Sequence, residues 1–215
     1  MNNQQQPLEY KIHGLFPIPV YQTHRELDLD SSEKKDIEDI IEEGIYFDTM
    51  HSFSNNSYIF NTKLKKLKEF CEEHIKIYVK EIIKPKEELD FYITQSWLNV
   101  TKPGGGHQYH THGNSIISGA FYIETDVGQS ISCHDPNQKI KQHIAITPQD
   151  IANIWSADTI SFTVEKNILM LFPSWLEHGI PSNKKQTKNV ISLSFNTFIK
   201  GNLGKRNQFN QLILQ

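Results

Sequence analysis

The chain has 215 residues, of which 37% are hydrophobic and 22% charged, and this predicts a globular protein with one sizeable core. A formal net charge of −3 argues against broad binding to nucleic acid or to anionic membranes. The two cysteines lie outside any CxxC motif, the first residues are polar and no apolar run is long enough to span a membrane, so we expect a cytoplasmic protein without a disulfide scaffold, signal peptide or membrane helix.

The first part of the chain predicts an edge strand followed by a helix. Residues 15–21 are apolar but interrupted by two prolines, a composition that is tolerated at the edge of a sheet. Asp30, followed three residues later by Glu33, forms a capping-box pattern that marks the start of a helix. The apolar positions of this helix repeat at helical spacing: Ile37, Ile40 and Ile41.

A loop and a longer helix are expected next. Residues 46–60 are rich in aromatic residues, Asn and Ser, which favours a loop. Asn61 and Thr62 can cap a second helix, and we expect both helices to be packing elements with solvated charged faces. The apolar stripe of the second helix consists of Leu64, Leu67, Phe70, Cys71, His74, Ile75, Tyr78, Val79 and Ile82.

From residue 91 onward, short β-branched and aromatic runs alternate with turn residues, which is typical of a sandwich or jelly roll. We therefore expect a mainly β fold with an N-terminal helical layer packed outside the barrel. The single predicted domain consists of an N-terminal strand and helical layer (1–90), a jelly-roll core (91–200) and a C-terminal extension (201–215). The expected strands are residues 91–100, 115–124, 130–134, 151–156, 159–164, 167–172 and 189–199. The expected core includes Trp97, Phe121, Leu169, Leu171 and Phe195.

Three histidines form the most informative pattern of the chain. His110 and His112 are one residue apart, so their side chains point to the same side of an extended segment. A later histidine, His178, can close a three-ligand site that leaves open positions on an iron or zinc ion. A lone histidine usually has a structural role, but the pair earlier in the chain makes His178 a candidate metal ligand as well. His107 is out of phase with the pair and is expected not to be a ligand.

The strand expected at residues 189–199 presents a row of mainly polar residues on one face: Val190, Ser192, Ser194 and Asn196. This row either lines a cavity inside the barrel or faces water. Gly119 is expected to leave space at the barrel interior. Tyr122 follows it on the same predicted strand, and its hydroxyl either reaches a ligand or belongs to a core tyrosine.

Six motifs follow one another along the second half of the chain. They are Trp97-Leu98-Asn99-Val100, Pro103-Gly104, His110-Thr111-His112, Ser118-Gly119-Ala120-Phe121-Tyr122, Phe172-Pro173-Ser174-Trp175-Leu176-Glu177-His178 and Ser192-Leu193-Ser194-Phe195-Asn196. Together they resemble a family of 2-oxoglutarate- and Fe(II)-dependent oxygenases that occur in bacteria and marine phages, and the match covers roughly residues 90–200. The resemblance implies a double-stranded β-helix (a cupin-like jelly roll), with Fe(II) at His110, His112 and His178 and with 2-oxoglutarate as cosubstrate.

The chain departs from the wider superfamily at two positions. His112 stands where relatives usually carry an aspartate, so three neutral imidazoles leave the full charge on a divalent metal. Val190 stands where relatives usually carry an arginine that binds the distal carboxylate of 2-oxoglutarate in a bidentate pair. We expect Lys188 to replace that arginine as a point charge, helped by the Ser192 hydroxyl and by Tyr122, with Asn196 in the same cosubstrate site.

The sequence therefore predicts an oxygenase that hydroxylates an unidentified substrate: a protein side chain, a metabolite or a nucleobase. Two other functions stay open. One is a three-histidine cupin-like metalloprotein that does not use 2-oxoglutarate. The other is a non-catalytic jelly roll that binds a metal or another ligand. No membrane partner is expected, and a homodimer stays open.

Overall fold

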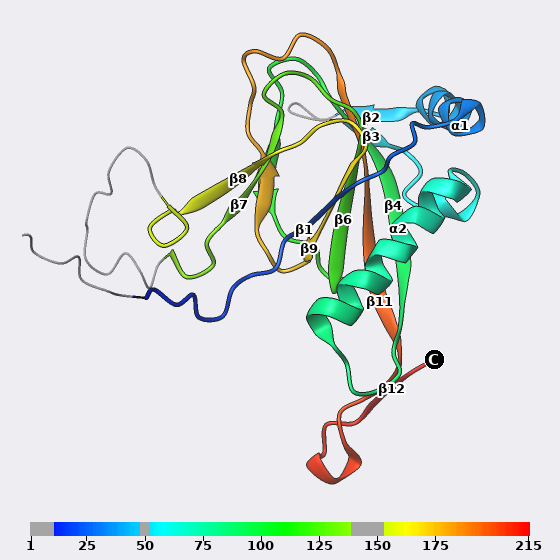
Figure 1. The fold of residues 1–215 in the computed structure, drawn as a ribbon. Helices are drawn as coiled ribbons and strands as arrows, with labels where there is room; N and C mark the ends of the chain where they lie inside the picture. The colour runs from blue at the N-terminus through cyan, green and yellow to red at the C-terminus, as the bar shows by residue number, and fades with distance from the viewer. Residues whose placement is uncertain (1–10, 48–51, 139–152) are drawn as a thin grey trace, which may run out of the picture.

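Two facing antiparallel sheets form the body of the protein in a computed structural model that describes residues 11–47, 52–138 and 153–215 (Figure 1). The larger sheet has the order β1-β9-β6-β11-β4-β3-β2, with β12 paired to β11, and the smaller has the order β5-β10-β7-β8. The predicted mainly β jelly roll is confirmed. The larger sheet contains β1 (Tyr21–His24), β2 (Ile45–Phe47), β3 (Ser52–Ser54), β4 (Asp90–Thr101), β6 (Ile117–Glu124), β9 (Ile168–Pro173), β11 (Val190–Leu203) and β12 (Leu212–Leu214); the smaller contains β5 (His107–His110), β7 (Ser130–His134), β8 (Thr159–Thr163) and β10 (His178–Ile180).

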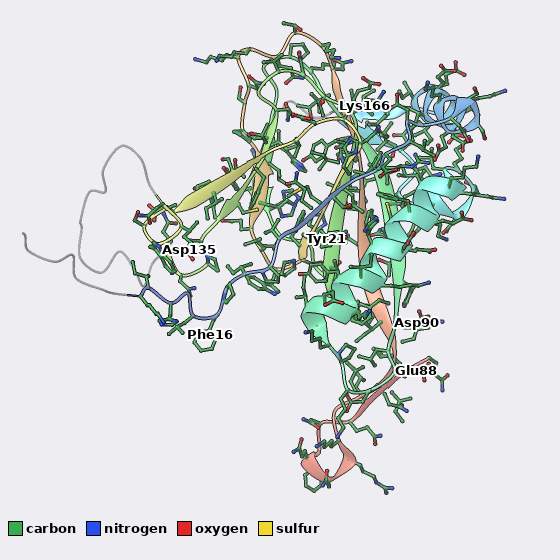
Figure 2. All side chains as sticks on the ribbon, viewed as in Figure 1. Phe16, Tyr21, Glu88, Asp90, Asp135 and Lys166 are labelled. Atoms are coloured by element: carbon green, nitrogen blue, oxygen red, sulfur yellow. The ribbon has the colours of Figure 1, made fainter. Side chains whose placement is uncertain are left out.

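Two helices cover the outer face of the larger sheet (Figure 1). They are α1 (Ser31–Glu42) and α2 (Lys65–Tyr78), and α2 continues as a π-helical turn, η2 (Val79–Ile83). Two short 3-10 turns complete the elements, η1 (Ile59–Asn61) and η3 (Arg206–Gln208). Tyr21 on β1 also reaches α2, where a hydrogen bond of 2.7 Å joins its hydroxyl to His74 Nδ1 (Figure 2). No helix in the described part of the chain combines the length and apolar character that crossing a membrane requires.

Side-chain alternation divides the larger sheet into a helix-covered face and a face that looks into the barrel. The helix-covered face forms one buried cluster with the apolar stripes of α1 and α2, including Ile40, Leu67, Cys71, Ile75, Leu98, Phe121, Leu169, Leu171, Leu193 and Phe195. A second cluster fills the barrel between the two sheets and consists of Ala120, Tyr122, Ile131, Cys133, Val164, Ile168, Met170, Phe172, Leu176 and Val190. We call this second group the interior cluster.

Four of the five predicted core residues are fully buried on the helix-covered face, but Trp97 is only half-buried. Its position on β4 is in phase with Asn99 and opposite to Leu98, so it faces the barrel rather than the helices. The predicted role of Gly119 is also wrong. A Cβ there would collide with the ring of Phe195, so this glycine makes room on the helix-covered face and not in the interior.

The capping box at the first helix is confirmed. The Glu33 N–H donates to Asp30 Oδ1 at 2.9 Å, and the Asp30 N–H donates to Glu33 Oε2 at 3.0 Å. The cap predicted for the second helix is wrong. That helix begins at Lys65, and the N–H of the preceding Leu64 donates to the side chain of Asp36 at 2.7 Å. The cap therefore comes from α1, far away in sequence.

Three segment predictions also need correction. The predicted loop at residues 46–60 contains the end of β2 and all of β3, and these strands extend the larger sheet beside β4. The edge strand expected at residues 15–21 begins only at Tyr21, after both prolines, and pairs with β9. Of the strand expected at residues 151–156, only 153–156 lie within the described residues. They form a turn in which the Ala157 N–H donates to the Asn153 carbonyl at 2.8 Å.

Candidate metal centre

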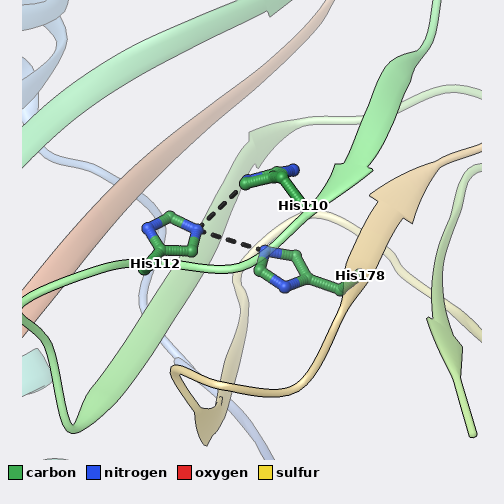
Figure 3. Close-up of side chains that lie close together, drawn as sticks. All are labelled: His110, His112 and His178. Atoms are coloured by element: carbon green, nitrogen blue, oxygen red, sulfur yellow. Dashed lines mark hydrogen bonds between the residues drawn. The ribbon is translucent and has the colours of Figure 1, made fainter. Parts of the chain in front are cut away.

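Three imidazoles converge where two strands of the smaller sheet meet (Figure 3). His110 ends β5, His112 follows it by two residues, and His178 begins β10, where it pairs with His110 in the antiparallel ladder. His112 Nε2 lies 3.2 Å from His110 Nε2 and 3.3 Å from His178 Nε2. The structure thus brings together the three histidines that the sequence pattern singled out.

Close contact between β10 and β5 makes this convergence geometrically feasible. Gly179 directly follows His178, and a Cβ at this glycine would lie 2.8 Å from the carbonyl oxygen of His107. Any larger residue would push the strands apart and move His178 away from His110. A glycine at this position therefore helps to set the spacing of the imidazoles.

Main-chain carbonyls fix the tautomers of two of the three rings. His110 Nδ1–H donates to the Gln108 carbonyl at 2.8 Å, and His178 Nδ1–H donates to the Leu176 carbonyl at 2.9 Å. With the proton on Nδ1, each ring presents an unprotonated Nε2 to the centre of the group. Hydrogen bonds of this kind orient a histidine for metal binding, because they leave the coordinating lone pair free.

Burial keeps two of the imidazoles neutral. Desolvation lowers the pKa of His178 to about 3, an effect that the nearby His110 and His112 reinforce. Desolvation also lowers the pKa of His112 to about 4, and His110 lowers it further, whereas a hydrogen bond with the Asn196 side chain raises it. Near neutral pH both rings are therefore unprotonated, the state that a metal ligand requires.

The geometry fits a bound metal ion. With its N–H donated to Asn196, His112 also turns an unprotonated nitrogen toward the other two rings, so three lone pairs meet. Two imidazole nitrogens that are each ~2.0–2.1 Å from one metal, at angles of roughly 90–110°, lie about 2.8–3.4 Å apart. The two observed Nε2 separations fall within that range. A cation would relieve the repulsion between the lone pairs, and the all-nitrogen donor set suits iron or zinc.

Aromatic rings hold the imidazoles from both sides. Trp97 stacks on His112 with ring centroids 5.7 Å apart, and Phe172 lies against His178 at 4.4 Å. Sequence reasoning placed Trp97 in the core and so missed this contact, although its in-phase position with Asn99 on β4 offered a signal. The tryptophan N–H donates to Asn99 Oδ1 at 3.1 Å, which continues the contacts into the barrel.

A buried hydroxyl network anchors the backbone around His112. The His112 N–H donates to the Ser174 carbonyl at 2.9 Å. Ser174 and Ser118 hydroxyls lie 2.8 Å apart, and the Ser118 hydroxyl donates to Asn196 Oδ1 at 2.9 Å. Asn196, which was expected to bind the cosubstrate, thus lies beside a histidine and connects β11 to the site. The sequence analysis assigned no role to Ser118 or Ser174.

The other predicted cosubstrate residues differ in their surroundings. Ser192 is buried within 3.5 Å of Asn99 Nδ2, and Tyr122 is buried in the interior cluster. Lys188 is exposed in the loop before β11. Its backbone N–H donates to Asp126 Oδ2 at 3.0 Å. Val190, at the position expected for an arginine in relatives, is buried in the interior cluster. The roles predicted for these residues stay proposals.

His107 lies beside the group without belonging to it. Its ring centroid is 4.2 Å from that of His110, but the converging ligand atoms come only from the other three histidines. Its Cα partner is Ile180, past a register shift in the ladder between β10 and β5. The expectation that His107 is not a ligand stays a prediction.

Comparison with solved structures shows the same fold in several proteins. The carbocyclase SnoK of nogalamycin biosynthesis superposes with a TM-score of 0.59 at 10% identity, over 86% of this chain and 81% of that one. The viral collagen prolyl hydroxylase of Paramecium bursaria Chlorella virus 1 gives 0.53 at 10% identity, over 83% and 94%. HygX from Streptomyces hygroscopicus, solved with nickel, 2-oxoglutarate and hygromycin B, gives 0.52 at 9% identity, over 84% and 82%.

Sequence comparison finds one family model for the barrel. No curated protein sequence matches the chain. Residues 95–196, however, match the family described as "Putative 2OG-Fe(II) oxygenase", and this segment contains His110, His112 and His178 together with most of the barrel. This segment is therefore similar to the 2OG-Fe(II) oxygenase family.

Proposed function

We propose that the protein hydroxylates a C–H bond of an unidentified substrate, with His110, His112 and His178 as the ligands of Fe(II). The observation that carries this proposal is the convergence of three imidazoles in a chain whose residues 95–196 match the family model of 2OG-Fe(II) oxygenases. When bound, Fe(II) and 2-oxoglutarate together supply the oxidising chemistry with O2, and the protein supplies binding and orientation.

The chain's own residues perform three tasks in this proposal. The histidines bind the metal in their neutral form, and the Gln108 and Leu176 carbonyls keep their rings oriented. Trp97 and Phe172 hold two of the rings in position. The interior cluster excludes water from the inner side of the site.

Cosubstrate binding is proposed for the interior face of β11 and its neighbours. Ser192 and Asn196 lie on that face, Tyr122 faces the same interior from β6, and Lys188 precedes it. HygX, which has the same fold, was solved with nickel and 2-oxoglutarate bound, and this supports a similar ligand here. We also propose a cytoplasmic location, because both cysteines are buried free thiols, as is usual in a reducing compartment.

Anaerobic titration of the metal-free protein tests the proposal. Fe(II) followed by 2-oxoglutarate should produce the visible charge-transfer absorption of a chelated 2-oxo acid, with one iron per chain by metal analysis. His178→Ala should abolish metal retention and absorption. His107→Ala is the matched control, because its ring contacts His110 but lies outside the converging group, and it should retain both. Two results would overturn the proposal: a wild type that binds no metal, or a His178→Ala variant that retains the metal.

A second candidate function is a three-histidine metalloprotein that does not use 2-oxoglutarate. The observation that favours it is Val190, an apolar side chain that lies buried in the interior cluster at the position where relatives are expected to carry the arginine for the distal carboxylate. In that case the protein would bind one iron or zinc ion, but millimolar 2-oxoglutarate would produce neither heat of binding nor charge-transfer absorption. The same titration therefore distinguishes the two functions.

A further inference from the structure

One buried side chain in the described barrel has no hydrogen-bond partner at either end of its amide. Gln129 is 1% exposed, and neither Nε2 nor Oε1 bonds to any other group. An unpaired buried amide destabilises a folded protein, because both atoms have lost their water. A ligand that enters the barrel would provide the missing partner.

The position of Gln129 on its strand directs it into the barrel. It immediately precedes β7 and is in phase with Ile131 and Cys133, both of which belong to the interior cluster. Its carbonyl accepts a hydrogen bond of 3.0 Å from the N–H of Val164, another member of that cluster. Gln129 therefore lies on the inner face of the smaller sheet.

Gln129 lies next to the start of β7, whereas His178 pairs with Cys133 near the end of that strand, and three loops meet near the start. The Ser182 hydroxyl donates to the Gly104 carbonyl at 2.7 Å, and the Asn183 side chain donates to the Val127 carbonyl at 2.8 Å. These bonds tie the loops before β5, β7 and β11 together. The amide is thereby shielded from bulk water, which strengthens any hydrogen bond it makes.

The distance from the histidines suits a short diacid. His178 pairs with Cys133, and Gln129 lies four residues before Cys133, roughly 13 Å along an extended strand. Side chains stand roughly perpendicular to a strand, so the amide of Gln129 stays separated from the level of His178 by about this distance. A five-carbon 2-oxo diacid spans roughly 7 Å between its outermost oxygens, and a metal–oxygen bond of ~2 Å at one end with a hydrogen bond of ~3 Å at the other brings the total to roughly 12 Å. A ligand chelated at the histidines would therefore reach the amide with its far end.

The charges are also compatible with a carboxylate at this place. A divalent metal held by three neutral imidazoles keeps two positive charges, which balance the two negative charges of 2-oxoglutarate. The far carboxylate then needs hydrogen-bond donors more than a cation, and the Gln129 amide offers two N–H groups. The buried Tyr122 side chain faces the same interior.

We propose that Gln129 binds the distal carboxylate of 2-oxoglutarate through its side-chain N–H groups and so determines cosubstrate specificity in place of a cation. This inference rests on the proposed function, because it assumes that the three histidines hold the metal that chelates the other end. It assigns to a neutral amide a task that the sequence analysis assigned to Lys188.

Calorimetric titration of Mn(II)-loaded protein with two ligands tests the inference. The ligands are 2-oxoglutarate and 2-oxopentanoate, which has the same chain length but lacks the distal carboxylate. Wild type should prefer 2-oxoglutarate at least tenfold, and Gln129→Met should lose that preference while retaining Mn(II) affinity within twofold. Gln129→Glu, which replaces the N–H donors with a negative charge, should bind 2-oxoglutarate more weakly than Gln129→Met.

Thermal unfolding of the ligand-free variants separates a binding role from a structural one. Gln129→Met should leave the Tm unchanged or raise it, because an apolar side chain replaces an unpaired amide. Gln186→Met is the matched control. Its Nε2 donates to the Thr101 and Lys188 carbonyls, each at 2.8 Å, so its loss should lower the Tm.

Two results would overturn the inference while leaving the proposed function intact. One is an unchanged preference for 2-oxoglutarate in Gln129→Met. The other is equal affinity of the wild type for both ligands. A wild type that binds neither ligand at millimolar concentration would overturn the inference and the proposed function together.

Discussion

Replacing His178 with leucine should make the metal-free protein less sensitive to acid. The folded-state pKa of His178 is lowered to about 3 and that of His112 to about 4, in both cases mainly by burial, from an ordinary value of 6.5. Below pH 6.5 the unfolded chain therefore binds protons that the folded chain rejects. The stability that depends on these rings is complete above pH 6.5 and is lost as the pH falls toward the folded-state pKa values.

The size of the effect follows from the same pKa values. Between pH 7.5 and pH 5.0, each histidine that stays neutral in the folded state costs about 2 kcal/mol of unfolding free energy. Wild type should lose on the order of 4 kcal/mol through the two rings, and His178→Leu on the order of 2 kcal/mol. Urea unfolding in the presence of a chelator at both pH values measures the difference, and carboxylates titrating elsewhere cancel in the comparison. Equal losses in both proteins would refute the reasoning.

Three further substitutions test other parts of the structure. Asp30→Ala removes the capping box of α1 and should lower the unfolding free energy by about 1 kcal/mol, measured by urea unfolding; no change would mean that the cap contributes nothing. Gly119→Ala should cost about 1–3 kcal/mol because its Cβ collides with the Phe195 ring, and adding Phe195→Leu should recover part of that loss. Lys188→Ala should weaken 2-oxoglutarate binding by no more than about fivefold in calorimetry, because exposed charges contribute up to about 1 kcal/mol. A larger loss would mean that Lys188 binds the distal carboxylate.

Local patterns in the sequence predicted the parts of the site and fold that depend on near neighbours. His110 and His112 share a side because strand geometry alternates every residue, and no tertiary information is needed for that inference. The capping box at Asp30 is equally local, because its donors and acceptors are three residues apart. The position of His178 was accessible only through the resemblance to a family, since its pairing with β5 spans most of the barrel.

Features that depend on distant contacts were missed or misplaced. The cap of α2 comes from Asp36, so the residues next to that helix gave no correct signal. The strands β2 and β3 have three residues each, too few to show an alternating pattern, and they exist because β4 offers them a free edge. Gln129 is an ordinary polar residue in sequence, and its missing partners become visible only when the barrel closes around it.

His112 and Val190 are both neutral where relatives are expected to carry charged residues. The first lacks the negative charge of an aspartate, and the second lacks the positive charge of an arginine. An aspartate at position 112 would add a negative charge beside the metal, and an arginine at position 190 would add a positive charge in the interior. With Fe(II) and 2-oxoglutarate bound, the three-histidine site of this chain sums to zero, and a site with both substitutions also sums to zero. Either substitution alone leaves one uncompensated charge in surroundings where the interior cluster excludes water.

The two substitutions should therefore compensate for each other in 2-oxoglutarate binding. His112→Asp should weaken binding to the Mn(II)-loaded protein, because it places an anion beside the ligand's carboxylate, and Val190→Arg should strengthen it, because it places a cation in the interior. The attraction between the two introduced charges is present in both the free and the ligand-bound protein, so the two effects on binding should add, and the double variant should bind 2-oxoglutarate more tightly than His112→Asp alone. Calorimetry on the four proteins measures these affinities, with the Tm of each as a check on folding. A double variant that binds as weakly as His112→Asp would show that charge balance does not explain the joint occurrence of the two residues.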